Sequence, residues 1–169
     1  MTSRTIAIMQ PTYLPWIGYF DMIDQSDEFV FLDSVQFNKR SWQQRNRIKA
    51  PEHVMWLTVP VFSKGRREQN ICEVEIDRTA DFAEKHLKSI AFLYGKAPYF
   101  SNYYEGLAVV LRTGHSLLSD LNIALTQWFC AQFGIDTPLT RSSTLSASGR
   151  KTELLVAICA ELRVDCYLS

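Results

Sequence analysis

Residues 9–19 of this chain are Met-Gln-Pro-Thr-Tyr-Leu-Pro-Trp-Ile-Gly-Tyr, and the expected architecture follows from them. The apolar run at 4–8 predicts a buried strand, and the apolar spacing of 16–23 predicts a helix. Pro11 and Pro15 each fix φ and remove a backbone donor, so neither element can continue through the segment. We therefore expect a stiff turn between a strand's carboxyl end and a helix N-terminus. Open α/β sheets bind ligands at such turns, and the free N–H groups there favour anions.

This turn supplies the first candidate ligand contacts. Its amide and phenol groups can form hydrogen bonds, its aromatic rings can stack on a base or a sugar, and its glycine lies at the mouth of the helix. The alternative is a rigid structural corner with a packed tryptophan. The candidates are Gln10, Tyr13, Trp16 and Gly18.

The next apolar run, residues 29–32, is typical of a strand buried on both faces of a parallel sheet. Strand, helix and strand over about 30 residues form a βαβ unit with a right-handed crossover. Asp33 would then stand at the carboxyl end of its strand, beside Gln10 and Tyr13. It is a candidate catalytic carboxylate, and the alternative is a turn or capping residue.

Residues 37–61 predict a basic β-hairpin inserted into the α/β unit. The segment 37–49 carries five basic residues, a tryptophan and no acid, and its alternation places Arg45, Arg47 and Lys49 on one face. Residues 55–61 predict the returning strand. Such a hairpin can recognise phosphate or carboxylate, and the alternative is a solvated hairpin without a ligand. The candidates are Lys39 as a catalytic residue, and Arg40, Trp42, Arg45 and Arg47 as substrate contacts.

In the rest of the chain, the apolar patterns predict short strands at 72–76, 138–141 and 164–169. They predict helices at 82–94, at 98–112, from Ser116 or Ser119 to Gly134, and from about residue 149. Ser142 and Ser143 follow a strand and are further candidate substrate contacts, although such serines more often cap turns. We expect one α/β domain over 1–169, with a mostly parallel, Rossmann-like (nucleotidylyltransferase-like) sheet, an inserted β-hairpin and a helical middle section.

Composition excludes several classes of protein. Of the 169 residues, 47% are hydrophobic, and 18 basic residues balance 18 acidic ones, so no overall field favours nucleic acid or a membrane. No apolar run predicts a membrane span or a signal peptide, and no cysteine pair has C-x-x-C spacing. The histidines follow no metal-ligand spacing, and the common catalytic motifs are absent. We expect a reduced, cytoplasmic protein without a metal site. No cofactor is evident in the sequence, and a nucleotide or nucleotide-sugar is the candidate.

Segments 10–20, 29–33 and 35–49 together resemble the WbqC-like protein family, and 56–60 and 96–100 agree with it. The resemblance covers essentially the whole chain. It implies a place among bacterial O-antigen and other surface-polysaccharide proteins, and a role in transferring glycine or another acyl group to a sugar. Two departures stand out. Met9 occupies a position where the family often has histidine, and the family continues past Ser169, which implies a C-terminally truncated chain lacking part of its active site.

The expected function is a transferase in surface-polysaccharide biosynthesis, carrying out acyl, glycyl or nucleotidyl transfer on a phosphate-bearing sugar. The expected partner is a phosphate- or carboxylate-bearing small molecule. Two alternatives remain open at this point. One is a non-catalytic interaction subunit of a glycan pathway, and the other is a single-stranded nucleic-acid-binding module that uses the same basic, aromatic hairpin.

Overall fold

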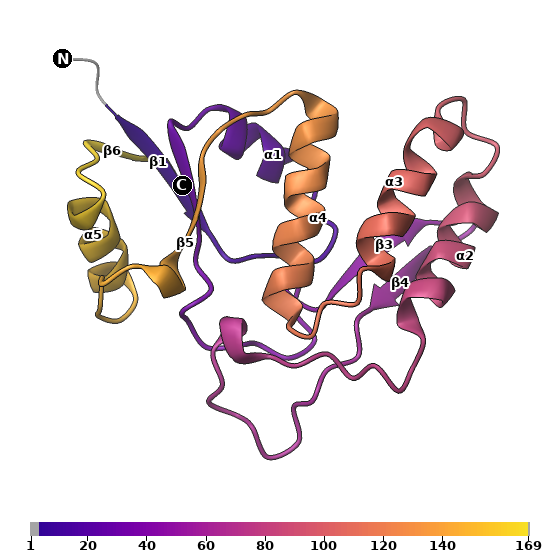
Figure 1. Ribbon diagram of the computed structural model, residues 1–169, viewed down its shortest axis with the longest axis horizontal. Helices are drawn as coiled ribbons and strands as arrows, with labels where there is room; N and C mark the ends of the chain where they lie inside the picture. Colours follow the sequence, from indigo (N-terminus) through magenta and orange to yellow (C-terminus); the bar gives the residue numbers. More distant parts are fainter. Residues whose placement is uncertain (1–3, 169) are drawn as a thin grey trace.

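The computed structural model describes residues 4–168, and four parallel strands form its main sheet in the order β5-β2-β1-β6 (Figure 1). The predicted βαβ opening is confirmed, because β1 pairs in parallel with β2 through Ile6 and Glu28. The strands are β1 (Thr5–Met9), β2 (Glu28–Phe31), β5 (Leu139–Arg141) and β6 (Cys166–Leu168), and the first connecting helix is α1 (Ile17–Asp24).

Helices cover both faces of this sheet (Figure 1). Successive side chains of a strand point to opposite faces, so β1 divides its residues between two hydrophobic clusters. Ala7 packs with the cluster under α1 and α4, which includes Tyr19 and Phe20, and Ile6 packs with the cluster under α5. The covering helices are α4 (Leu118–Phe133) and α5 (Thr152–Glu161). Strands with both faces buried explain the continuous apolar runs in the sequence.

The order of the strands determines where a ligand crevice belongs. The chain leaves β1 toward β2 through α1, whereas β6 pairs with the other edge of β1 and is reached through α5. The direction of connection therefore reverses beside β1. In open α/β sheets, ligands bind outside the carboxyl ends of the strands at such a reversal.

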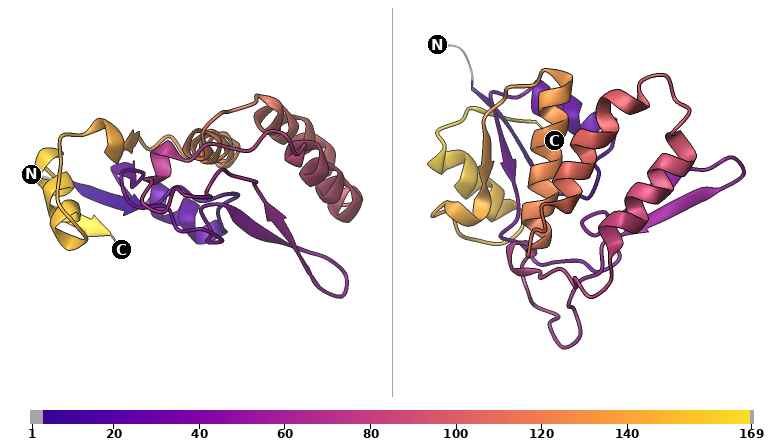
Figure 2. Two further views of the ribbon diagram at one scale, coloured as in Figure 1. Left: turned by 90° about the horizontal axis from the view of Figure 1, so that it is seen from below. Right: turned by 45° about the vertical axis from the view of Figure 1, so that its right-hand side comes forward.

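A hairpin and two helices form a second packing unit beside the sheet (Figure 1). Leu57 of the hairpin, Leu87 of α2 and Leu111 of α3 belong to one hydrophobic cluster, which also takes in Leu121 and Leu125 of α4. Helix α4 thus packs against the sheet and against this unit, and the hairpin projects away from the sheet (Figure 2). The elements are β3 (Arg45–Lys49), β4 (Val54–Thr58), α2 (Phe82–Tyr94) and α3 (Phe100–Arg112).

The start of α2, the end of α4 and the hairpin agree with the predictions from the sequence. Asp81 caps α2 by accepting a hydrogen bond from the Glu84 N–H, and Gly134 ends α4 with a left-handed φ of 72°. The prediction of an antiparallel hairpin is confirmed by the pairing of Arg47 with Trp56. The last predicted strand is present as β6, and its final position, 169, lies outside the described residues.

The predicted strand at 72–76 is wrong. The structure has a 3-10 helix, η1 (Ile71–Glu73), and leaves Glu75 and Ile76 in isolated bridges only. The Glu73 carboxylate accepts a 2.7 Å hydrogen bond from the N–H of Asn70, so this side chain initiates a helical turn that the weak alternation of apolar residues did not reveal.

Among residues 4–168, no helix combines the length and the apolar composition that crossing a bilayer requires.

Candidate functional site

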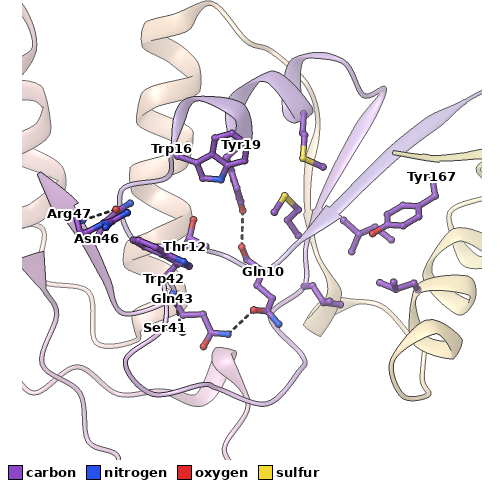
Figure 3. Close-up of a pocket in the computed structure, with 15 residues that line it drawn as sticks. Gln10, Thr12, Trp16, Tyr19, Ser41, Trp42, Gln43, Asn46, Arg47 and Tyr167 are labelled. Atoms are coloured by element: carbon purple, nitrogen blue, oxygen red, sulfur yellow. Dashed lines mark hydrogen bonds between the residues drawn. The ribbon is translucent and has the colours of Figure 1, made fainter. Parts of the chain in front are cut away.

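A cavity of about 940 Å³ opens at the carboxyl ends of β1 and β6, where the strand order predicts a ligand crevice (Figure 3). Met9 and Gln10 of the β1 end and Tyr167 of β6 lie on its wall. Much of its lining is apolar, which is typical of a small-molecule site. The remaining lining residues are Ile8, Thr12, Trp16, Tyr19, Met22, Leu32, Ser41, Trp42, Gln43, Asn46, Arg47 and Leu155.

The turn that contains Pro11 and Pro15, which we call the proline-braced turn, lies beside this cavity and is held in place by hydrogen bonds. Leu14 adopts a left-handed φ of 48°, which a leucine rarely takes and which needs support from its surroundings. Asn46 of β3 supplies that support, because its side-chain amide donates hydrogen bonds to the carbonyls of Tyr13 and Leu14. The N–H of Tyr13 donates a 2.9 Å hydrogen bond to the carbonyl of Trp42. The turn is therefore fastened directly to the hairpin and its entry loop.

A hydrogen-bond chain joins the turn, the loop and α4. The Gln43 side chain donates to the Gln10 side chain at 2.8 Å, and the Tyr19 hydroxyl donates to the Gln10 carbonyl at 3.1 Å (Figure 3). Asn122 of α4 is completely buried and donates to the Gln43 carbonyl at 2.8 Å and the Pro11 carbonyl at 3.3 Å. The two segments that the sequence singled out thus face one cavity.

The hairpin and its entry loop carry a ladder of two tryptophans and two arginines, of which Arg45 is half-buried and the other three side chains are exposed. The rings of Trp42 and Trp56 stack at 5.7 Å with an interplanar angle of 29°. The Arg45 guanidinium lies 4.2 Å from the Trp56 ring, and that of Arg47 lies 5.3 Å from the Trp42 ring. Neither arginine takes part in the five ion pairs of residues 4–168. Neither charge is neutralised by a carboxylate, and the rings orient both guanidinium groups. Of the two, Arg47 lines the cavity, so its charge is the one available to an anion bound there.

Gly18 acts through Trp16 rather than by contact with the cavity. Trp16 is 61% exposed, and its ring folds back over Gly18 so closely that a Cβ there would lie 1.9 Å from a ring carbon. The absence of a side chain at Gly18 therefore sets the position of the tryptophan on the cavity wall.

Replacing Gly18 by alanine is expected to move the Trp16 ring away from the cavity. Since this ring is mostly exposed, it can turn outward, and the free energy of unfolding should change by no more than about 1 kcal/mol. In protein labelled with 5-fluorotryptophan, the ¹⁹F NMR signal of Trp16 should shift, while that of Trp128 stays in place. Gly65→Ala is the control for the spectrum, because an added Cβ there meets nothing within 4 Å; its left-handed φ of 76° makes this variant less stable, but the Trp16 signal should not shift. An unchanged Trp16 signal would contradict the contact.

Asp33 does not face the crevice. It is completely buried, and Arg141 donates to its Oδ2 at 2.9 Å. Ser143 donates from its N–H to Oδ1 and from its hydroxyl to Oδ2, both at 2.9 Å, and the Ser142 hydroxyl donates to Oδ1 at 3.2 Å. The predicted positions of Asp33, Ser142 and Ser143 in the crevice are therefore wrong, because these groups satisfy one another at the join between β2 and β5.

Other candidates also lie away from the cavity. Tyr13 is completely buried, and its hydroxyl lies 2.8 Å from Nδ1 of His86, so its expected exposure to a ligand is wrong. Lys39 and Arg40 are exposed in the turn before the hairpin, outside the cavity lining, and Arg40 has a left-handed φ of 63°. Arg45 stacks on Trp56 outside the lining.

Several lining residues escaped the sequence analysis. Asn46 lies between Arg45 and Arg47 in β3, and an uncharged amide between two cations was the available signal. Gln43 precedes the strand and carried no periodic signal. Tyr167 joins the site only through the pairing of β6 with β1, which links residues more than 150 positions apart. Among residues 4–168, no group of three His, Cys, Asp or Glu side chains could hold a metal ion.

Comparison with known proteins agrees with this picture at the level of the family. The sequence matches the WbqC-like protein family over residues 10–169. It is 40% identical over 167 residues to the protein named "Uncharacterized protein Rv1507c" of Mycobacterium tuberculosis, and the match covers 98% of this chain and 72% of that relative. No solved structure matches the chain. The mixed α/β architecture is thus established by the structure, and the narrower Rossmann-like assignment stays a prediction.

Proposed function

The chain belongs to the WbqC-like protein family, and from this premise we propose that its crevice binds a nucleotide or nucleotide-sugar as a substrate of a transferase in bacterial surface-polysaccharide biosynthesis. One observation carries the proposal. The proline-braced turn and the basic hairpin, 33 residues apart at Gln10 and Gln43, are hydrogen-bonded to each other on the wall of one cavity. This cavity lies where α/β sheets bind nucleotides.

The chemistry of the lining supports an anionic ligand with a planar ring. Trp16 and Trp42 offer aromatic faces for a base or sugar ring, and Arg47 offers a guanidinium for phosphate. Gln10 can form hydrogen bonds that orient the bound molecule. Within the described chain, Arg47 is the single charged residue on the cavity wall, so an anionic ligand would meet no carboxylate there.

This lining favours catalysis by positioning. Within residues 4–168, neither an imidazole nor a carboxylate lines the cavity, so neither group is placed there for general acid–base catalysis. In phosphoryl and nucleotidyl transfer, most of the rate enhancement comes from aligning reactants and neutralising charge. The same alignment would serve acyl or glycyl transfer, and mass spectrometry of the sugar product distinguishes these reactions.

Arg47→Gln is expected to weaken binding of the nucleotide roughly ten- to a hundredfold, because a charge-assisted hydrogen bond to phosphate contributes roughly 1.5–3 kcal/mol. The measurement is a thermal-shift screen of the five common nucleoside monophosphates and their diphosphate-sugars, followed by titration calorimetry of the best ligand. Arg45→Gln is the matched control. It removes the same charge from the same strand at a position outside the cavity lining, and it should change affinity by less than about twofold.

Two outcomes would contradict the proposal. One is the absence of stabilisation by any phosphate-bearing ligand. The other is binding of an oligonucleotide, with a steep dependence on salt and equal losses in both variants. That result would indicate a single-stranded nucleic-acid site on the exposed Trp42–Trp56 ladder.

A further inference from the structure

A second cavity, of about 780 Å³, adjoins the first along the carboxyl edge of the sheet. Gln10, Leu32 and Leu155 line both cavities, so the two form one crevice with a shared middle. This middle carries no charge, and we call these three residues the saddle. The other residues that line the second cavity are Ser34, Val35, Gln36, Glu68, Asn70, Gly149, Arg150, Lys151 and Leu154.

The two cavities differ in chemistry. The first is bordered by Trp16 and Trp42, whereas no aromatic side chain borders the second in the part of the chain that the structure describes. Its uncharged polar lining consists of hydroxyl and amide side chains, the groups that form hydrogen bonds with sugar hydroxyls. These are Ser34, Gln36 and Asn70, together with Gln10 of the saddle.

A separate pair of cations borders the second cavity. Arg150 and Lys151 are exposed, and neither takes part in the five ion pairs of residues 4–168. Glu68 is the acid on this wall, so the lining carries a net positive charge. Lys151 is held at a left-handed φ of 51°, two residues after the conformationally permissive Gly149 at φ 136°. Each cavity therefore has its own cationic group, and the uncharged saddle lies between them.

We propose that the second cavity is a separate subsite for a phosphorylated sugar, which binds together with the nucleotide ligand of the first cavity. The inference rests on the proposed function and identifies its second substrate. A single nucleotide-sugar that spanned both cavities would carry its phosphates in its middle, over Leu32 and Leu155, where no cation lies. Two ligands instead place one anion at Arg47 and one at the Arg150–Lys151 pair. A transferase requires two substrates, and their facing ends would meet over the saddle.

The test measures binding of glucose 1-phosphate, mannose 1-phosphate and galactose 1-phosphate to the full chain by titration calorimetry, with glucose and inorganic phosphate as partial probes. The double variant Arg150→Gln/Lys151→Gln should weaken the best sugar phosphate at least tenfold. It should change the affinity of the best nucleoside monophosphate by less than about twofold. Lys64→Gln/Lys96→Gln is the matched control, because it removes the same charge from exposed positions outside both cavities.

Competition decides whether the subsites are separate. With the nucleoside monophosphate at saturation, the sugar phosphate should still bind with at least its original affinity. Displacement by the nucleotide, or an unchanged affinity in the Arg150→Gln/Lys151→Gln variant, would overturn the second subsite and leave the proposed function standing. Binding of the nucleotide without binding of any sugar phosphate would do the same. If no phosphate-bearing ligand binds at all, the proposed function and this inference fall together.

Discussion

Replacing Asp33 by alanine is expected to lower the free energy of unfolding by about 3–5 kcal/mol, the largest effect of any single substitution considered for this protein. The carboxylate is completely buried and accepts hydrogen bonds from Arg141, Ser142 and Ser143. Its removal leaves the Arg141 guanidinium without its buried partner and leaves the Ser143 N–H, in the 3-10 turn that follows β5, without an acceptor. Urea denaturation measures the change.

Asp120→Ala is the matched control for this prediction. Asp120 pairs with the same Arg141, at 2.8 Å, but its side chain is 35% exposed, so its loss should lower the free energy of unfolding by less than about 1 kcal/mol. Similar losses in the two variants would contradict the structural role of Asp33. A stable Asp33→Asn protein that loses activity while still binding nucleotide would restore Asp33 as a catalytic candidate.

The contribution of His86 should lower the free energy of unfolding by about 2–3 kcal/mol as pH decreases from 7.5 to 4.5. Burial lowers the pKa of His86 to about 4, against an ordinary value of 6.5, with a smaller opposing effect from the Thr58 main chain. Burial also raises the pKa of Tyr13, which therefore stays protonated and can donate its hydroxyl hydrogen to neutral His86 at Nδ1. Protonation of that nitrogen removes the acceptor.

The sign follows from the depressed pKa of folded His86. Above pH 6.5 the ring is neutral in both the folded and the unfolded chain, and its contribution to stability is fully present. Between pH 6.5 and pH 4 the unfolded chain takes up the proton first, so stability is lost as pH falls. Urea denaturation across this range should show the loss in the wild type, and His86→Gln should abolish that component. His53→Gln, in the exposed hairpin turn, should retain it, and equal slopes in the wild type and His86→Gln would contradict the assignment.

Local signals allowed much of the fold to be predicted. Apolar runs identified β1 and β2, the Asp81 cap and Gly134 located the ends of α2 and α4, and strict alternation identified the hairpin. These signals depend on interactions between residues a few positions apart, which the sequence states directly. The 3-10 turn at 71–73 was not predicted, because the hydrogen bond of the Glu73 carboxylate determines the local structure and the weak alternation of apolar residues does not.

The candidate site was predicted less completely. Two signals in the sequence pointed to residues of the cavity wall. The end of the first strand indicated Gln10 and Trp16, the basic hairpin indicated Trp42 and Arg47, and all four line the cavity. Asp33 was misplaced. Its position after a strand is equally typical of an exposed functional carboxylate and of a buried one. Only the contacts of Asp33 with Arg141 of β5 and with the two serines that follow β5 separate these possibilities.

The sequence by itself determined the elements, the parallel βαβ opening and the two segments that face the crevice, because periodicity, prolines and clustered charge act over short distances. Tertiary structure alone decided which polar side chains remain free. The pairing of β5 and β6 with strands more than 100 positions away encloses Asp33 and adds Tyr167 to the cavity, and the packing of α2 encloses Tyr13 with His86. Burial and hydrogen-bond satisfaction depend on these long-range neighbours, which no local pattern of residues specifies.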